Sequence, residues 1–128
     1  MSNAVSIFDN LEGQKHVSLA SYRRNGQIVH TAIWFALHNG VLYARSMADA
    51  GKVKRIRNRS DVTVAICNAA GIVKGPEISG IARLLDNNDR LVATANSLLD
   101  EKYGEQRRQL ARTMPTDARM VYIEVRPN

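Results

Sequence analysis

The segment from His16 to Arg45, HVSLASYRRNGQIVHTAIWFALHNGVLYAR, decides the fold. Apolar or small residues alternate along its first part, which predicts a strand. Asn25-Gly26 and Asn39-Gly40 are strong signals for tight hairpin turns. Between these turns both faces of the chain are mostly apolar, which predicts a central strand covered on both sides. We therefore expect a three-stranded meander with strands at His16–Arg23, Ile28–Leu37 and Val41–Arg45.

The rest of the chain adds strands and a few helices. Ser6 is placed to cap a short helix through Leu11. A longer helix is expected to start at a cap on Asn87 or Asn88 and to reach Tyr103, where Gly104 breaks it. Three further strands are predicted at Asp61–Asn68, Glu77–Leu85 and Met120–Val125. Six strands joined mainly by tight hairpins indicate a mainly β (α+β) fold, a closed or split antiparallel barrel with a few peripheral helices.

Length and composition limit the class of protein. The 128 residues suit one domain, and no linker or repeat divides the range 1–128. A single cysteine, Cys67, allows no intramolecular disulfide and fits a reducing compartment. The first residues do not resemble a signal peptide, and no apolar run is long enough to span a bilayer. We expect a cytoplasmic protein without a membrane partner.

The densest chemical signal lies in a basic segment. The sequence AGKVKRIRNR, residues 50–59, brings five cations into eight residues. At about 100° per residue, Lys52, Arg55 and Arg59 share one stripe of a helix, and Val53 and Ile56 lie on another stripe that can face a core. A strand end, a glycine turn and a helix N-terminus that converge with cations favour an anion. The net charge of +6 agrees, so a phosphorylated small molecule is the expected ligand.

Other kinds of site are not indicated. The three histidines are scattered and show no metal-ligand spacing, so no metal is expected. The chain has no P-loop, GxGxxG or GxSxG motif. Aromatic residues make up only 5% of the chain, and no nucleic-acid-binding motif is visible, so nucleic acid is not an expected partner. No acid–base pair stands out and the catalytic residues stay unassigned, which is compatible with a redox enzyme whose cofactor carries the chemistry.

Several segments together resemble a known group of proteins. They are Ser21–Gly26, Thr31–Phe35, Gly51–Ile56, Gly80–Leu85 and Lys102–Gly104, and they occur in this order over nearly the whole chain. The set resembles the pyridoxamine 5′-phosphate oxidase-like split β-barrel superfamily. Within it, the chain is most similar to the deazaflavin (coenzyme F-420) dependent oxidoreductases of actinobacteria.

The resemblance implies a homodimer with a cofactor at each subunit interface and hydride transfer between a reduced deazaflavin and a small organic acceptor. By this resemblance, Ser46, Lys52 and Arg55 would hold the cofactor phosphate. Three further cations would neutralise its acidic tail: Lys54, Arg57 and Arg59. Thr31, Ala32, Ile33 and Trp34 would border the ring, and Cys67 and Asn68 lie where the family brings a strand near the cofactor.

Two positions depart from the pattern of the family. Many relatives have proline where this chain has Ala32, and aspartate where it has Asn68. These departures leave FMN open as the cofactor, because the superfamily uses both groups. A cofactor-binding protein without turnover also stays open as an alternative to an enzyme.

Overall fold

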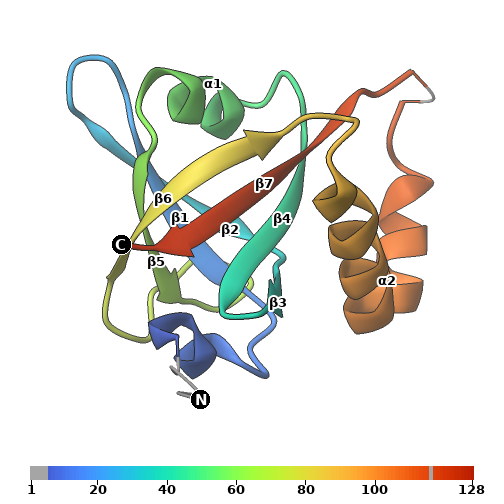
Figure 1. Cartoon of the computed structure of the whole chain (residues 1–128), viewed down its shortest axis with the longest axis horizontal. Helices are drawn as coiled ribbons and strands as arrows, with labels where there is room; N and C mark the ends of the chain where they lie inside the picture. The colour runs from blue at the N-terminus through green and yellow to red at the C-terminus, as the bar shows by residue number, and fades with distance from the viewer. Residues whose placement is uncertain (1–5, 116) are drawn as a thin grey trace.

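A computed structural model describes residues 6–115 and 117–128 of the chain. It contains seven strands, two α-helices and one 3-10 helix (Figure 1). In chain order they are η1 (Ile7–Leu11), β1 (Val17–Tyr22), β2 (Ile28–Ile33), β3 (Ala36–His38), β4 (Val41–Met47), α1 (Gly51–Asn58), β5 (Asp61–Ile66), β6 (Ile78–Leu85), α2 (Arg90–Ala111) and β7 (Met120–Pro127).

The strands form one antiparallel sheet in the order β2-β1-β5-β6-β7-β4-β3. The predicted mainly β split-barrel class is thereby confirmed. The predicted strand over 28–37 is divided at Trp34-Phe35, and its halves β2 and β3 lie at opposite edges of the sheet. The prediction of a central strand was therefore wrong. Its apolar faces have another cause: the segment crosses from one sheet edge to the other, so it contacts the core and α2 in turn.

The barrel interior holds the main core. Strand residues of the inner face, such as Leu19, Leu42 and Ile123, are fully buried there. One end is closed by α1 through Val53 and Ile56, and η1 covers the opposite end (Figure 1). The helix predicted after Ser6 is confirmed as η1, whose capping box is made by the Ser6 side chain and by the Asp9 side chain, which accepts from the Ser6 amide. The amphipathic division predicted for the basic helix is confirmed as well.

The long helix α2 lies against the flank of the sheet (Figure 1). Its N-cap is Asp89, whose carboxylate accepts a hydrogen bond from the Leu91 amide at 2.9 Å. The prediction of Asn87 or Asn88 as the cap was wrong by one or two residues. Gly104 interrupts the helix with φ +43°, a left-handed conformation that favours glycine. The chain then continues helically to Ala111, so the two halves of α2 meet at an angle.

Candidate functional site

The basic helix α1 supplies two cations that lie close together. Val53 and Ile56 point into the barrel, which leaves Lys52 and Arg55 on the outer side of the helix. Arg55 Nε donates to the buried Ser21 hydroxyl of β1 at 2.7 Å. A Cβ atom added to Gly51 would lie 2.8 Å from Arg55 Nη1. The Arg55 guanidinium therefore lies across the first turn of α1, in the space that a side chain at residue 51 would take.

This cluster carries positive charge that the protein leaves uncompensated. Burial and then the Arg55 charge lower the pKa of Lys52. Burial and then the Arg23 charge lower the pKa of Arg55. No carboxylate of the described residues lies within 4.0 Å of Arg23, Lys52 or Arg55. The helix N-cap, Ala50, also provides no side-chain hydrogen bond to the amides of the first turn. The arrangement suits a bound anion of two or more oxygen atoms.

The other cations of α1 lie elsewhere. Arg59 forms two hydrogen bonds with the Asp61 carboxylate, at 2.7 and 2.9 Å, and its guanidinium stacks 3.8 Å above the Tyr22 ring. These contacts hold the Arg59 guanidinium away from the Lys52–Arg55 cluster. Lys54 and Arg57 instead line a separate surface hollow together with Arg119. The predicted stripe of Lys52, Arg55 and Arg59 is therefore divided, and only its first two members meet.

Ser46 belongs to the inner face of β4, the face that also carries Leu42 and Ala44. Its side chain is buried and its hydroxyl donates to the Met47 carbonyl at 3.1 Å. Ser46 lies near the start of α1 in the sequence, but its hydroxyl is turned toward the barrel interior. Sequence reasoning had no means of fixing this, because the inward face of β4 depends on its register with β7.

The segment predicted to border the cofactor ring forms an edge strand. Among the residues that the structure describes, β2 pairs only with β1, so one side of its backbone has no strand partner there. Register with β1 places Thr31 and Ile33 on the inner face and Ala32 on the outer face. An edge strand presents unpaired amide and carbonyl groups, which a polar ring system can use. The edge position thus makes the backbone of residues 31–33 more available to a ligand than a central strand would.

Cys67 and Asn68 lie at the far end of β5, where a loop folds back toward β2. The Asn68 side chain accepts from the Ile72 amide at 2.9 Å and thereby shapes this loop. Gly71 of the loop approaches the Ala32 side chain, since a Cβ atom at residue 71 would lie 3.9 Å from it. Burial raises the pKa of the Cys67 thiol, which disfavours the reactive thiolate. Ala32 and the loop of Asn68 thus come together on the outer face.

These two groups of residues lie at different heights along β1. Arg55 contacts Ser21, and Ala32 is the register partner of Ser18. Three residues of strand correspond to about 10 Å. The anion site and the loop of Asn68 are therefore about 10 Å apart along β1, the first at Ser21 on the inner face and the second at Ser18 on the outer face.

Sequence reasoning missed the part played by Tyr103. Its ring stacks on Trp34 with centroids 4.5 Å apart and planes at 7°. Its hydroxyl accepts from the Phe35 amide at 2.9 Å and donates to the Lys15 carbonyl at 2.8 Å. Trp34 Nε1 in turn donates to His16 Nε2 at 3.2 Å. The signal was present in the sequence: Ala95, Leu99 and Tyr103 recur every four residues and form the buried stripe of α2.

No group of three or more His, Cys, Asp or Glu residues in ranges 6–115 and 117–128 is arranged to hold a metal ion. Within the same ranges, no helix combines the length and the apolar character needed to cross a membrane.

No protein-family model matches the chain, and no curated protein matches it by sequence. Several solved structures do match it in fold. HutZ, the haem storage protein of Vibrio cholerae, matches with a TM-score of 0.74 at 13% identity, over 95% of this chain and 87% of that chain. A candidate pyridoxamine 5′-phosphate oxidase from Listeria innocua matches with a TM-score of 0.65 at 18% identity, over 95% and 90%. An F-420 reductase matches with a TM-score of 0.63 at 19% identity, over 100% and 96%.

These proteins share an architecture across low sequence identity. The similarity covers 95–100% of this chain in these three comparisons. The chain therefore has the split β-barrel fold of the pyridoxamine 5′-phosphate oxidase-like proteins.

Proposed function

We propose that this protein is a deazaflavin-dependent oxidoreductase that binds coenzyme F-420 and transfers a hydride between it and a small organic acceptor. The observation that carries the proposal is the uncompensated cluster of Arg23, Lys52 and Arg55 at the start of α1. A cluster of like charges is unfavourable in the free protein and becomes favourable when a phosphate neutralises it. The sequence resemblance and the fold shared with an F-420 reductase support this choice of ligand.

The residues present fit a phosphorylated ring cofactor. Lys52 and Arg55 would bind its phosphate, and the free backbone edge of β2 would orient its ring beside Ala32. The hollow of Lys54, Arg57 and Arg119, with a volume of about 610 Å³, would take an acidic tail on its three cations, which outnumber the two aspartates of its lining, Asp49 and Asp117. When bound, the deazaflavin supplies the hydride chemistry. The chain itself would contribute binding, orientation and exclusion of water, the last through the loop of Asn68.

We further propose that the site is completed by a second copy of the chain. The outer face of β1 and β5 carries small, buried side chains, Ser18, Ala20 and Ala65. Ile28 and Ile81 lie exposed on the same face, at 38% and 41%. A shallow face of small side chains with an apolar border suits a flat, self-complementary contact. Light scattering of the purified protein tests this, and a monomeric mass at micromolar concentration would exclude a stable homodimer.

FMN is the main alternative cofactor. It also carries a phosphate on the side chain of its ring, so the cluster of Lys52 and Arg55 would bind it as well. A cofactor-binding protein without turnover is a further alternative. The occurrence of this fold in a haem storage protein supports it. Single-turnover measurements with reduced cofactor and a panel of quinones and enones separate an enzyme from a carrier.

The decisive experiment uses matched pairs of ligands. Fluorescence titrations compare F-420 with its deazariboflavin core, which lacks the phosphate and tail, and FMN with riboflavin. We expect Lys52→Ala/Arg55→Ala to weaken F-420 binding about tenfold or more and to leave binding of the core unchanged. The control Arg90→Ala/Arg112→Ala removes the same charge from exposed positions on α2 and should change neither. Equal affinity of wild type and double variant for F-420 would contradict the proposal, and tighter binding of FMN would select the alternative.

A further inference from the structure

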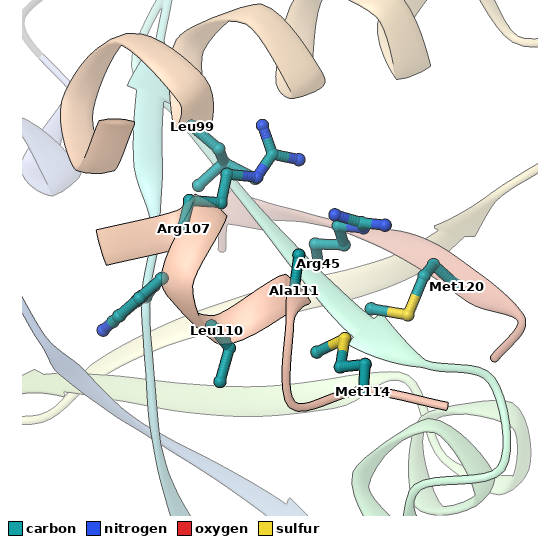
Figure 2. Close-up of a pocket in the computed structure, with 8 residues that line it drawn as sticks. Arg45, Leu99, Arg107, Leu110, Ala111, Met114 and Met120 are labelled. Carbon is teal, nitrogen blue, oxygen red and sulfur yellow. The ribbon is translucent and has the colours of Figure 1, made fainter. Parts of the chain in front are cut away.

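A second, separate hollow lies beside Trp34, between α2 and the sheet. It is bounded by the second half of α2 and by the outer faces of β4 and β7, and it encloses about 70 Å³. Figure 2 shows Arg107, Leu110 and Ala111 from α2 facing Arg45 of β4, with Met114 and Met120 closing one side. We call this hollow the α2 pocket. Its lining is Trp34, Arg45, Leu99, Arg107, Leu110, Ala111, Met114 and Met120.

The lining is mostly apolar and includes two guanidinium groups. They differ in how many hydrogen bonds they make to the protein. Arg107 is held in place by its neighbours: it donates to the Asn96 carbonyl at 2.8 Å, to Asn96 Oδ1 at 2.7 Å and to the Tyr122 hydroxyl at 3.2 Å, and it pairs with the Asp100 carboxylate at 3.8 Å. The Arg45 side chain has no hydrogen bond or ion pair to any residue in the described ranges. Arg45 is the register partner of Tyr122, so the free guanidinium stands beside the engaged one.

We infer that the α2 pocket binds a small apolar monocarboxylic acid, with its carboxylate on Arg45 and its hydrocarbon part among Leu110, Met114 and Met120. A guanidinium with all its donors available matches the two oxygens of a carboxylate. One arginine can pair with a phosphate as well, but the mostly apolar lining favours a carboxylate, because its single charge costs less to bury than the charge of a phosphate. The enclosed volume admits a chain of a few carbons, and the two flexible methionines can adapt to its shape.

The methionines give an independent reason to expect an apolar ligand. Thioether side chains fill irregular space and change rotamer at small cost, which is why they recur where a surface must accept variable apolar groups. Met114 lies in the connection that follows α2 and Met120 begins β7, so a ligand between them and Leu110 would contact the helix and the sheet at once. The inference concerns the cofactor-free protein and does not depend on the proposed function.

The test uses intrinsic fluorescence, because Trp34 is the one tryptophan of the chain and lines the pocket. Butyrate, pentanoate and hexanoate are titrated into cofactor-free protein, each paired with its uncharged amide, and calorimetry repeats the strongest case. We expect each acid to bind at least tenfold more tightly than its amide. Affinity should rise about threefold per methylene until the pocket is filled.

Two substitutions decide the outcome. Arg45→Gln should remove the preference for acid over amide, and Arg90→Gln, which removes the same charge from the start of α2, should keep it. Arg45 is exposed, so folding of the variant is expected, and circular dichroism checks it. Arg45→Lys keeps the charge without the two-pronged geometry and should give an intermediate preference. Equal binding of acids and amides, absence of binding at millimolar acid, or an unchanged preference in Arg45→Gln would each overturn the inference.

Discussion

The Tyr103 hydroxyl lies 2.9 Å from the Phe35 amide nitrogen, and this bond ties α2 to the crossing between β2 and β3. The same oxygen donates to the Lys15 carbonyl at 2.8 Å, ahead of β1. One buried side chain therefore holds three segments that the sheet itself does not pair. Burial raises the pKa of Tyr103 to about 12, so the hydroxyl keeps its proton at neutral pH and can serve as a donor.

We expect Tyr103→Phe to lower the free energy of unfolding by about 1–3 kcal/mol, because the Phe35 amide and the Lys15 carbonyl lose a buried partner. Denaturant unfolding measures this. Tyr122→Phe is the matched control: its hydroxyl also bonds to Asn96 and Arg107, but at a more exposed place, so a smaller loss is expected. A loss in Tyr103→Phe no larger than in the control would show that the three-way contact adds little.

The close approach of Gly51 and Arg55 predicts that Gly51→Ala weakens phosphate binding without lowering the stability of the fold. In Gly51→Ala the new Cβ would lie 2.8 Å from Arg55 Nη1, the far end of a flexible side chain, which can move away. Alanine also suits a helix better than glycine, so thermal stability should be unchanged or slightly raised. Phosphate affinity should fall severalfold because the guanidinium leaves its position.

Titration with F-420 and its core compound checks this second prediction, with Gly75→Ala as the control. A Cβ atom at residue 75 meets only the Ile66 side chain at 3.6 Å, an ordinary contact. If both variants bound F-420 as tightly as the wild type, the position of the Arg55 guanidinium would not matter for the ligand.

Glu124 is the most buried acid of the described residues, with 1% exposure. Burial tends to raise its pKa, but hydrogen bonds from Arg83, Arg126 and Tyr43 outweigh this effect and hold the pKa below its usual value. We expect Glu124→Gln to destabilise the fold by about 1–3 kcal/mol, since the charge-assisted hydrogen bonds to the buried carboxylate are lost while the two exposed arginines stay solvated. Exposed Glu77→Gln is the control and should be near neutral.

The sign of the pH effect at Glu124 follows from its lowered pKa. The folded protein binds fewer protons at this group than the unfolded chain does, so the stabilisation is present above the ordinary carboxyl pKa and is lost as the pH falls through the folded value. The difference in stability between wild type and Glu124→Gln should therefore shrink under acid conditions. A constant difference from pH 7 to pH 3 would argue that the charge is not the cause.

The sequence was sufficient for the local structure because the relevant signals are local. Asn39-Gly40 adopts positive φ at both positions, +52° and +75°, as its hairpin requires, and Val53 and Ile56 are buried as their spacing predicted. The division of the 28–37 segment was not predictable in this way. Both halves are apolar, and only pairing with two distant strands shows that the chain leaves one sheet edge and joins the other.

The same distinction applies to the candidate site. The pairing of Lys52 and Arg55 follows from helical spacing. The loss of Arg59 to Asp61, the inward turn of Ser46 and the role of Tyr103 depend on register and on contacts between remote segments. The resemblance to a family predicts which residues are candidates for the site. It does not predict where each side chain points, because that depends on the register of the strands in the folded barrel.

Lys102 provides the last prediction. Its ammonium group lies 3.6 Å from the centre of the Phe35 ring, and burial lowers its pKa to about 8. Between about pH 8 and the ordinary lysine pKa, the folded protein therefore binds fewer protons than the unfolded chain, so stability should rise with pH over this window. Above pH 10 the raised pKa values of Tyr43 and Tyr103, each about 12, act in the opposite direction.

Lys102→Met keeps the apolar stem and removes the titration, so the stability difference between wild type and variant isolates the lysine. We expect this difference to change steadily from pH 8 to pH 10, in favour of the wild type. Lys54→Met, at an exposed position of α1, is the control and should show no such trend. A parallel course of the wild type and Lys102→Met curves would mean that the ammonium group stays solvated beside the ring.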